Sequence, residues 1–324
     1  MKRVLILLGL LILLASCSVE EPQTNTNDEK LNLALMIHIE GFKNEANDRD
    51  LFMMHAEKVE EMATILEEYG AKGTFEFSPE FIEGAINWNS NIIQELHDRG
   101  HGVGVHADAG FSVKGDYTYE VFVDQLTDMK TNIDSLVDFE VLHVSGICSK
   151  LDWVKAALES GFKFTTGNVG YCAMSMPENL RPEKFKSCGA PSDCHGAIPE
   201  DLLEGIKPFK ADSAENWLGS NEGELVIFNA RNTIYAQYEE SIGDTKGGSG
   251  EFTREDLENS YEDIDLAFEN LDGSTQLLYY GWSIGDLQLH DEEVLREWLS
   301  DIENNYVLTG KVEWKTIPKV YLEM

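Results

Sequence analysis

Three segments of the sequence carry a histidine followed two residues later by another polar side chain. They are His38 and Glu40 in IHIEGF, His106 and Asp108 in VHADAG, and His143 and Ser145 in LHVSG. Each segment reads as the end of an apolar strand, where residues two apart point to the same side. Imidazole and carboxylate ligands together suit zinc or a similar divalent ion, which acidifies a bound water and polarises a carbonyl group. One such histidine is more often structural, so the coincidence at three strand ends carries the prediction of a hydrolytic metal site.

The elements that must position these residues alternate between apolar strands and amphipathic helices. Strands are predicted at 33–39, 73–77, 101–106, 140–146, 163–171, 224–230, 275–282 and, closing the chain, 312–317. Helices are predicted at 50–70, from 78 onward, and at 91–100, 118–137, 151–161, 254–271 and 291–306. This pattern indicates an α/β fold, a distorted parallel (β/α) barrel of seven or eight strands, with an open doubly wound sheet as the alternative. In either fold, side chains at the carboxyl ends of the strands converge.

An irregular stretch at about 172–222 interrupts this alternation and predicts a lid or insertion. Apart from Cys17, the chain has four cysteines, which are Cys148, Cys172, Cys188 and Cys194. An even number outside the cytoplasm suggests two disulfides, with three connectivities. Cys188 and Cys194 lie in one loop and could close a small ring, while the other two end successive predicted strands and could meet at one rim. A zinc cluster is the rival interpretation, but no CxxC spacing supports it.

The first residues resemble a bacterial lipoprotein signal peptide, predicted over 1–16. Two basic residues precede a short apolar run, and Leu-Ala-Ser-Cys reads as a lipobox in which Cys17 becomes the lipidated first residue. An ordinary secretory signal is the alternative. The polar segment 17–30 would be a flexible tether, followed by the barrel at 31–324. These features predict an extracytoplasmic protein anchored to a membrane, at the cell surface or in the periplasm.

The net charge of −34 argues against a nucleic-acid partner and against electrostatic attachment to anionic lipid. The lipid on Cys17 would then be the only link to the membrane. We interpret the acidity as a solvated surface, with attraction for a cationic partner as the alternative. The oligomeric state stays open.

The order of these segments resembles the polysaccharide deacetylase (NodB-homology) family, also known as carbohydrate esterase family 4. LALMIHIEGF stands where the family has a strand ending in Thr-Phe-Asp-Asp-Gly, and GTFEF resembles its Ala-Thr-Phe-Phe strand. GHGVGVHADAG resembles Gly-His-x-(apolar)-Gly-x-His-Ser-x-x-His. The resemblance is good over 33–171. It implies a metal-dependent hydrolase that removes acyl groups from amino sugars of cell-wall or surface glycans by cleaving amide bonds.

The sequence departs from the family pattern at the residues that do the chemistry. In the family the first Asp of the Asp-Asp pair is the catalytic base and the second is a metal ligand; here Ile39 and Glu40 stand in their places. His106 matches the first ligand histidine, whereas Gly110 occupies the position of the second. His143 stands where the arginine that orients the base is expected. The late motif with a catalytic histidine would fall near YYGWS, which contains none.

These matches and departures together lead to the assignment of a rewritten site. Glu40, His106 and His38 are the predicted ligands of a divalent metal, with zinc favoured. Asp108 is the predicted replacement for the catalytic base, and His143 is the second predicted catalytic residue.

Aromatic side chains near strand ends suit a carbohydrate cleft, because their faces pack on sugar rings. Trp282 and Phe111 are the predicted substrate contacts, although aromatic residues at such positions are as often part of the core. Two other functions stay open. The protein could be a catalytically inactive glycan-binding lipoprotein on the same fold, or a structural lipoprotein with neither activity.

Overall fold

The structure is a computed structural model. It describes residues 29–42, 44–110, 117–189, 194, 201–219, 221–229, 254–284 and 292–324, and for 254–256 only the backbone. The predicted signal peptide, Cys17, nearly all of the predicted tether, and Phe111 lie outside these residues.

The described strands form a single sheet in which only one neighbouring pair is antiparallel. The strands are β1 (Leu31–Ile39), β2 (Gly73–Phe77), β3 (Gly102–His106), β4 (His143–Ser145), β5 (Phe164–Thr165), β6 (Phe209–Ala211), β7 (Leu225–Ile227), β8 (Leu277–Ile284) and β9 (Val312–Trp314). Their order is β6-β7-β5-β4-β3-β2-β1-β8, β9 also pairs with β1, and the antiparallel pair is β6 with β7. Parallel strands joined by helices confirm the predicted α/β fold.

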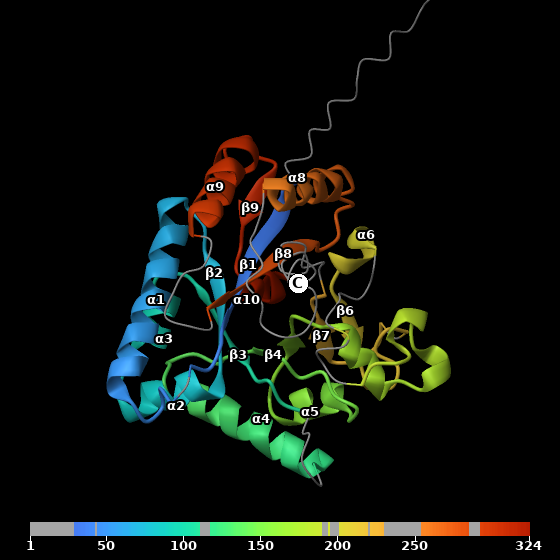
Figure 1. The fold of residues 1–324 in the computed structure, drawn as a ribbon. Helices are drawn as coiled ribbons and strands as arrows, with labels where there is room; N and C mark the ends of the chain where they lie inside the picture. The colour runs from blue at the N-terminus through green and yellow to red at the C-terminus, as the bar shows by residue number, and fades with distance from the viewer. Residues whose placement is uncertain are drawn as a thin grey trace, which may run out of the picture.

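Helices surround this sheet. In Figure 1, α1 and α3 lie at the left, beside β2, and α4 runs along the bottom of the view. The helices are α1 (Arg49–Glu68), α2 (Pro79–Asn87), α3 (Ile92–Asp98), α4 (Tyr119–Asp134), α5 (Trp153–Glu159), α6 (Leu202–Gly205), α8 (Arg254–Glu269), α9 (Glu292–Ile302) and α10 (Ile317–Glu323). None of the helices in the described part of the chain combines the length and apolar character needed to cross a bilayer.

The helix boundaries follow local sequence signals. The Ser78 hydroxyl accepts a hydrogen bond from the Phe81 N–H and so caps α2, which begins at Pro79. Helix α1 is capped by Asp48, which accepts from the N–H groups of residues 50 and 51, so the helix begins at Arg49, one residue before the predicted start. Gly70, at φ 67°, follows the end of α1 as predicted.

The last segment of the chain differs most from expectation. The predicted terminal strand ends at Trp314, and α10 follows it. The Ile317 N–H donates to Thr74 Oγ1 over 2.9 Å, and Tyr321 stacks on Phe164 with 4.8 Å between ring centroids. Helix α10 therefore packs against strands β2 and β5, and it also contacts β1 and β3.

The irregular stretch at 172–222 contains short elements that the sequence did not reveal. They are 3-10 turns, α6 and the antiparallel strand β6. The predicted strand at 163–171 shortens to β5, since Gly167 adopts a φ of 61°, and a 3-10 turn begins at Gly170. Two disulfides brace this region, Cys148–Cys172 and Cys188–Cys194, which is the pairing that the sequence favoured.

Candidate metal centre

Strand register brings polar residues into two rows on one face of the sheet. In the first row, His38 of β1 lies opposite Glu76 of β2, and Glu76 lies opposite Gly104 of β3. In the second row, two residues further along β3, His106 lies opposite Ser145 of β4. Because side chains alternate along a strand, both rows point to the same side.

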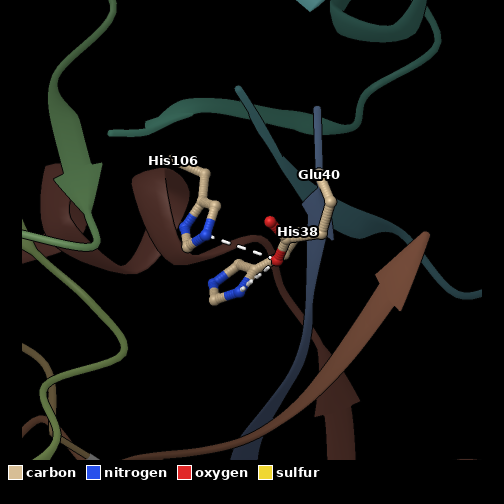
Figure 2. A group of neighbouring side chains, drawn as sticks. All are labelled: His38, Glu40 and His106. Carbon is tan, nitrogen blue, oxygen red and sulfur yellow. Dashed lines mark ion pairs between the residues drawn. The ribbon is translucent and has the colours of Figure 1, made fainter. Parts of the chain in front are cut away.

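The three predicted metal ligands converge at this position. One donor atom from each of His38, Glu40 and His106 lies within 4.8 Å of the others. His106 Nε2 is 3.4 Å and His38 Nδ1 is 3.9 Å from Glu40 Oε1. Figure 2 shows the two imidazoles stacked with the Glu40 carboxylate facing both; their centroids are 4.0 Å apart. Two imidazoles and a carboxylate match the donor set of many zinc sites.

The outer nitrogen of His106 is anchored away from the centre. His106 Nδ1 lies 2.9 Å from Ser145 Oγ, and the Ser145 hydroxyl donates to the Val105 carbonyl over 3.5 Å. This chain places a proton on Nδ1 of His106, so loss of the other proton would free the Nε2 lone pair on the side of Glu40 for a metal ion. Metal-binding histidines are usually oriented through their second nitrogen in this way.

The outer nitrogen of His38 faces a carboxylate that sequence reasoning missed. His38 Nε2 lies 3.0 Å from Glu76 Oε2, and the Glu76 side chain is fully buried. The signal was present, since GTFEF places one acidic residue in an otherwise apolar strand. With Nδ1 of His106 beside the Ser145 hydroxyl and Nε2 of His38 beside a carboxylate, the arrangement of these side chains fits a divalent metal ion.

Glu76 also contacts two further residues at its other oxygen. Glu76 Oε1 lies 3.1 Å from His143 Nε2 and accepts a hydrogen bond of 2.5 Å from Thr166 Oγ1. Burial alone would raise the pKa of Glu76, but contacts with His143 and His38 outweigh burial and hold the pKa well below its usual range. The buried carboxyl is therefore ionised at neutral pH.

His143 lies behind the three converging residues. It is fully buried, and its ring stacks on Phe164 with centroids 4.6 Å apart. Within the described residues its polar contact is with Glu76, so it could act on the centre through that carboxylate. The catalytic assignment of His143 stays a prediction, and the geometry favours a positioning role.

Electrostatics at His106 favour positive charge in the centre. Burial opposes protonation of the imidazole, but the neighbouring Glu40 and Asp108 carboxylates outweigh it and raise the pKa of His106 to about 9. The same negative potential would attract a divalent cation.

Asp108, the predicted base, lies at the edge of the centre. Its Oδ1 is 3.4 Å from His106 Nε2, and 57% of its side chain is exposed. Its φ of 44° is unusual for a residue other than glycine. The N–H groups of Ala107 and Ala109 donate to the Ser145 and Gly146 carbonyls and hold the loop in this conformation.

A groove of about 630 Å³ begins at this edge. Glu40 and Asp108 line one end, and the remainder is formed mainly by residues of α2 and α4, including Glu83 and Asp128. The centre is therefore open to molecules from solvent.

The side chains packed around Gly110 and Ile39 fit these residues and not the histidine and aspartate of the family pattern. A Cβ at Gly110 would lie 2.9 Å from both Phe122 Cζ and Ser149 Cβ, and Gly110 has a φ of 92°. A histidine would not fit there without rearrangement. Ile39, at the position of the usual base, is fully buried.

The register argues against the predicted sugar contact at Trp282. Trp282 lies opposite Ile37, so it points to the other side of the sheet from His38. Only 5% of Trp282 is exposed.

Comparisons of the sequence found no matching family model and no matching curated protein. Comparisons of the structure did find matches. A probable polysaccharide deacetylase from Pseudomonas aeruginosa PAO1 superposes with a TM-score of 0.57 and 8% identity, over 90% of each chain. The chain has the polysaccharide deacetylase fold. The predicted resemblance is thus confirmed at the level of fold.

Other proteins share this deacetylase fold. Puue allantoinase superposes with a TM-score of 0.57 and 8% identity, over 91% of this chain and 90% of that one. A 4-α-glucanotransferase from Thermococcus litoralis superposes with a TM-score of 0.54 and 15% sequence identity. The match spans 91% of this chain but only 41% of the transferase. In the deacetylase fold of this chain, His38, Glu40 and His106 gather at the carboxyl ends of β1 and β3, where ligands bind in α/β proteins.

Proposed function

We propose that the protein is a divalent-metal-dependent hydrolase that removes acyl groups from amino sugars of cell-wall or surface glycans. The observation that carries this proposal is the convergence of His38, Glu40 and His106, whose donor atoms lie within 4.8 Å of one another. Contacts from Ser145 and Glu76 to the outer ring nitrogens support it. Zinc is the favoured ion, because its usual ligands are imidazole and carboxylate groups.

The centre keeps the type of donor set that the resemblance implies but draws it from different positions. The family pattern has one carboxylate and two histidines, the second of which would stand at Gly110. Here the second imidazole is that of His38, on β1. The missing histidine at position 110, after β3, is therefore matched by an additional histidine on β1, which lies on the other side of β2.

A bound metal ion would supply an acidified water and would polarise the acyl carbonyl. The side chains of the protein would do the rest. His38, Glu40 and His106 would hold the ion. Asp108 would accept the proton of the attacking water, since it lies beside His106 at the mouth of the groove. The groove between α2 and α4 would admit the glycan.

The proposal includes a location outside the cytoplasm. The lipobox at Cys17 and the signal peptide at 1–16, which lie outside the described residues, would anchor the protein to a membrane by lipid alone. The two disulfides support an oxidising compartment.

A catalytically inactive glycan-binding lipoprotein is the second candidate function. It is favoured by the buried Ile39 at the position of the usual base, and by the packing that excludes a histidine at Gly110. On this alternative the groove would bind a glycan without metal and without hydrolysis.

The metal content of a soluble form beginning at Ser18 separates the two. We expect about one equivalent of zinc in the parent and loss of zinc in Glu40→Ala, His38→Ala and His106→Ala. Glu83→Ala, which alters the groove but not the centre, is the control and should keep the ion. Acetate release from N-acetylated glycans should follow the zinc content. A parent that binds no zinc, cobalt or manganese would leave the glycan-binding alternative.

A further inference from the structure

From the contacts of Glu76 we infer that this residue is a positioning residue for the metal centre. It holds the ring of His38 so that Nε2 carries the proton and the Nδ1 lone pair points toward Glu40 and His106. This inference rests on the proposed function, because it assigns a task to a residue outside the ligand set.

The placement of Glu76 follows from strand register. His38 and Glu76 are direct partners in neighbouring parallel strands, and both point to the inner face of the sheet. The Glu76 side chain is fully buried, and 11% of the His38 side chain is exposed. The pair therefore lies between the sheet and the exposed mouth of the centre, where Glu40 and Asp108 are found.

The contact between the two side chains sets the His38 tautomer. A carboxylate can only accept hydrogen bonds, so a nitrogen 3.0 Å from Glu76 Oε2 must carry the proton for the contact to be favourable. In a neutral imidazole the other nitrogen then holds the lone pair. That nitrogen, Nδ1, is the one that faces Glu40 Oε1.

The other oxygen of Glu76 is held from the opposite side. Thr166 donates to Glu76 Oε1, and His143 Nε2 lies 3.1 Å from the same atom. The His143 ring reaches Glu76 across β3 because residue 104 is glycine: a Cβ there would lie 2.1 Å from His143 Nε2. The Glu76 carboxylate is thus held at Oε1, which leaves Oε2 3.0 Å from His38 Nε2.

The cost of burying Glu76 supports a role beyond packing. Removing an ionised carboxylate from water destabilises the folded state by its lost hydration free energy. A well-packed apolar side chain at such a position often gives equal or greater stability. The contacts that compensate Glu76 come from His38, His143 and Thr166, which lie on three different strands or their ends. Carboxylates placed behind metal-bound histidines orient the ring and increase its basicity.

The first experiment compares Glu76→Gln with the parent by two readouts. Zinc affinity, measured by competition with a chromogenic chelator, should fall about 10- to 100-fold. Nitrogen-15 shifts of the His38 ring in the metal-free protein, assigned by their loss in His38→Ala, should show the proton on Nε2 in the parent. The glutamine amide can donate to the ring, so the proton should move to Nδ1 in the variant. Unchanged affinity together with an unchanged tautomer overturns the inference.

Two neighbouring threonines provide a test that does not depend on the folding of Glu76→Gln. Thr166→Val removes one hydrogen bond to Glu76, whereas Thr165→Val removes the hydroxyl that bonds to the Thr166 carbonyl and Asn168. Zinc affinity should fall several-fold in the first and stay at the parental value in the second. Equal affinities in both variants contradict the role of Glu76.

The outcomes also separate this inference from the proposed function. If the parent binds zinc and Glu76→Gln binds it equally well with the parental tautomer, the metal centre stands and the positioning role fails. If the parent binds no metal, the proposed function fails, and the His38 tautomer alone decides whether Glu76 positions that ring.

Discussion

The ring of His143 occupies the space above Gly104. A Cβ on Gly104 would lie 2.1 Å from His143 Nε2 and 2.3 Å from its Cε1, far inside van der Waals contact. This glycine belongs to the segment GHGVGVHADAG, and its lack of a side chain lets a residue of β4 reach a carboxylate on β2. One backbone position thus connects the packing of the sheet to the candidate metal centre.

Gly104→Ala should therefore damage stability and metal binding together. The added methyl group must displace a fully buried ring, so we expect the free energy of unfolding to fall by about 1–3 kcal/mol. Zinc affinity should fall as well, because His143 would lose its contact with Glu76. Chemical denaturation and chelator competition measure the two effects. Gly102→Ala, on the same strand but with nearest contacts at 3.0 Å, is the control and should be milder in both.

Gly110→His should not restore a ligand at that position. The backbone has a φ of 92°, and a Cβ would meet Phe122 and Ser149 at 2.9 Å. We expect a loss of stability of about 1–3 kcal/mol from backbone strain and overpacking, with zinc stoichiometry unchanged. Gly110→Ala carries the same strain without an imidazole, so the two variants should bind zinc alike. Tighter binding by Gly110→His alone would show that the loop can open.

Asp108→Asn should reduce turnover while leaving the metal in place. The amide cannot accept a proton, and loss of a general base typically lowers kcat by about 10²- to 10⁴-fold. Zinc content should stay near the parental value, since Asp108 lies outside the predicted ligand set. Asp124→Asn, exposed on α4 and outside the groove lining, is the matched control. Acetate release by Asp108→Asn at the parental rate would remove Asp108 from the mechanism.

Stability should fall with acid because of His101. The side chain is 2% exposed, and its Nδ1 accepts a hydrogen bond from the Gly73 N–H over 3.1 Å. Burial and then the nearby Lys72 charge lower the pKa of His101 to about 4, although Glu67 opposes them.

The unfolded chain has the ordinary histidine pKa of about 6.5, so it binds a proton first as the pH falls. The contribution of His101 is fully present above that value and is lost between pH 6.5 and about 4. In urea titrations we expect its share of the loss between pH 7 and 5 to be about 2 kcal/mol. His101→Gln should lose correspondingly less over this interval, and His97→Gln should behave like the parent. A parallel pH dependence of His101→Gln and the parent would contradict this.

Much of the candidate centre was accessible from local sequence. Apolar runs bounded by turn residues located the strands, and the two-residue spacing of His38 and Glu40 placed both on one side of β1. His106 lies at the end of another predicted strand. Because the carboxyl ends of parallel strands lie at the same edge of a sheet, the sequence predicted that His106 would lie close to His38 and Glu40. The structure brings these three within reach of one ion.

Local patterns failed where the answer depended on a partner far along the chain. Trp282 was expected to contact sugar, but pairing with β1 turns it to the opposite face. The catalytic role of His143 stays a prediction, and only the fold shows that its strand places it behind Glu76, at the far side of the first row. The helix that follows β9 was missed because its contacts are with residues more than 150 positions earlier in the chain.

The sequence by itself determined the alternation of strands and helices, the residue types at the strand ends, and the resemblance to polysaccharide deacetylases. These properties are local, since they follow from periodicity and from spacing within one element. Only the tertiary structure shows that the donor atoms of His38, Glu40 and His106 converge, that packing closes position 110, and that Glu76 lies behind the centre. Each of these depends on the register between strands and on the space between side chains, which arise when segments far apart in the sequence pack together.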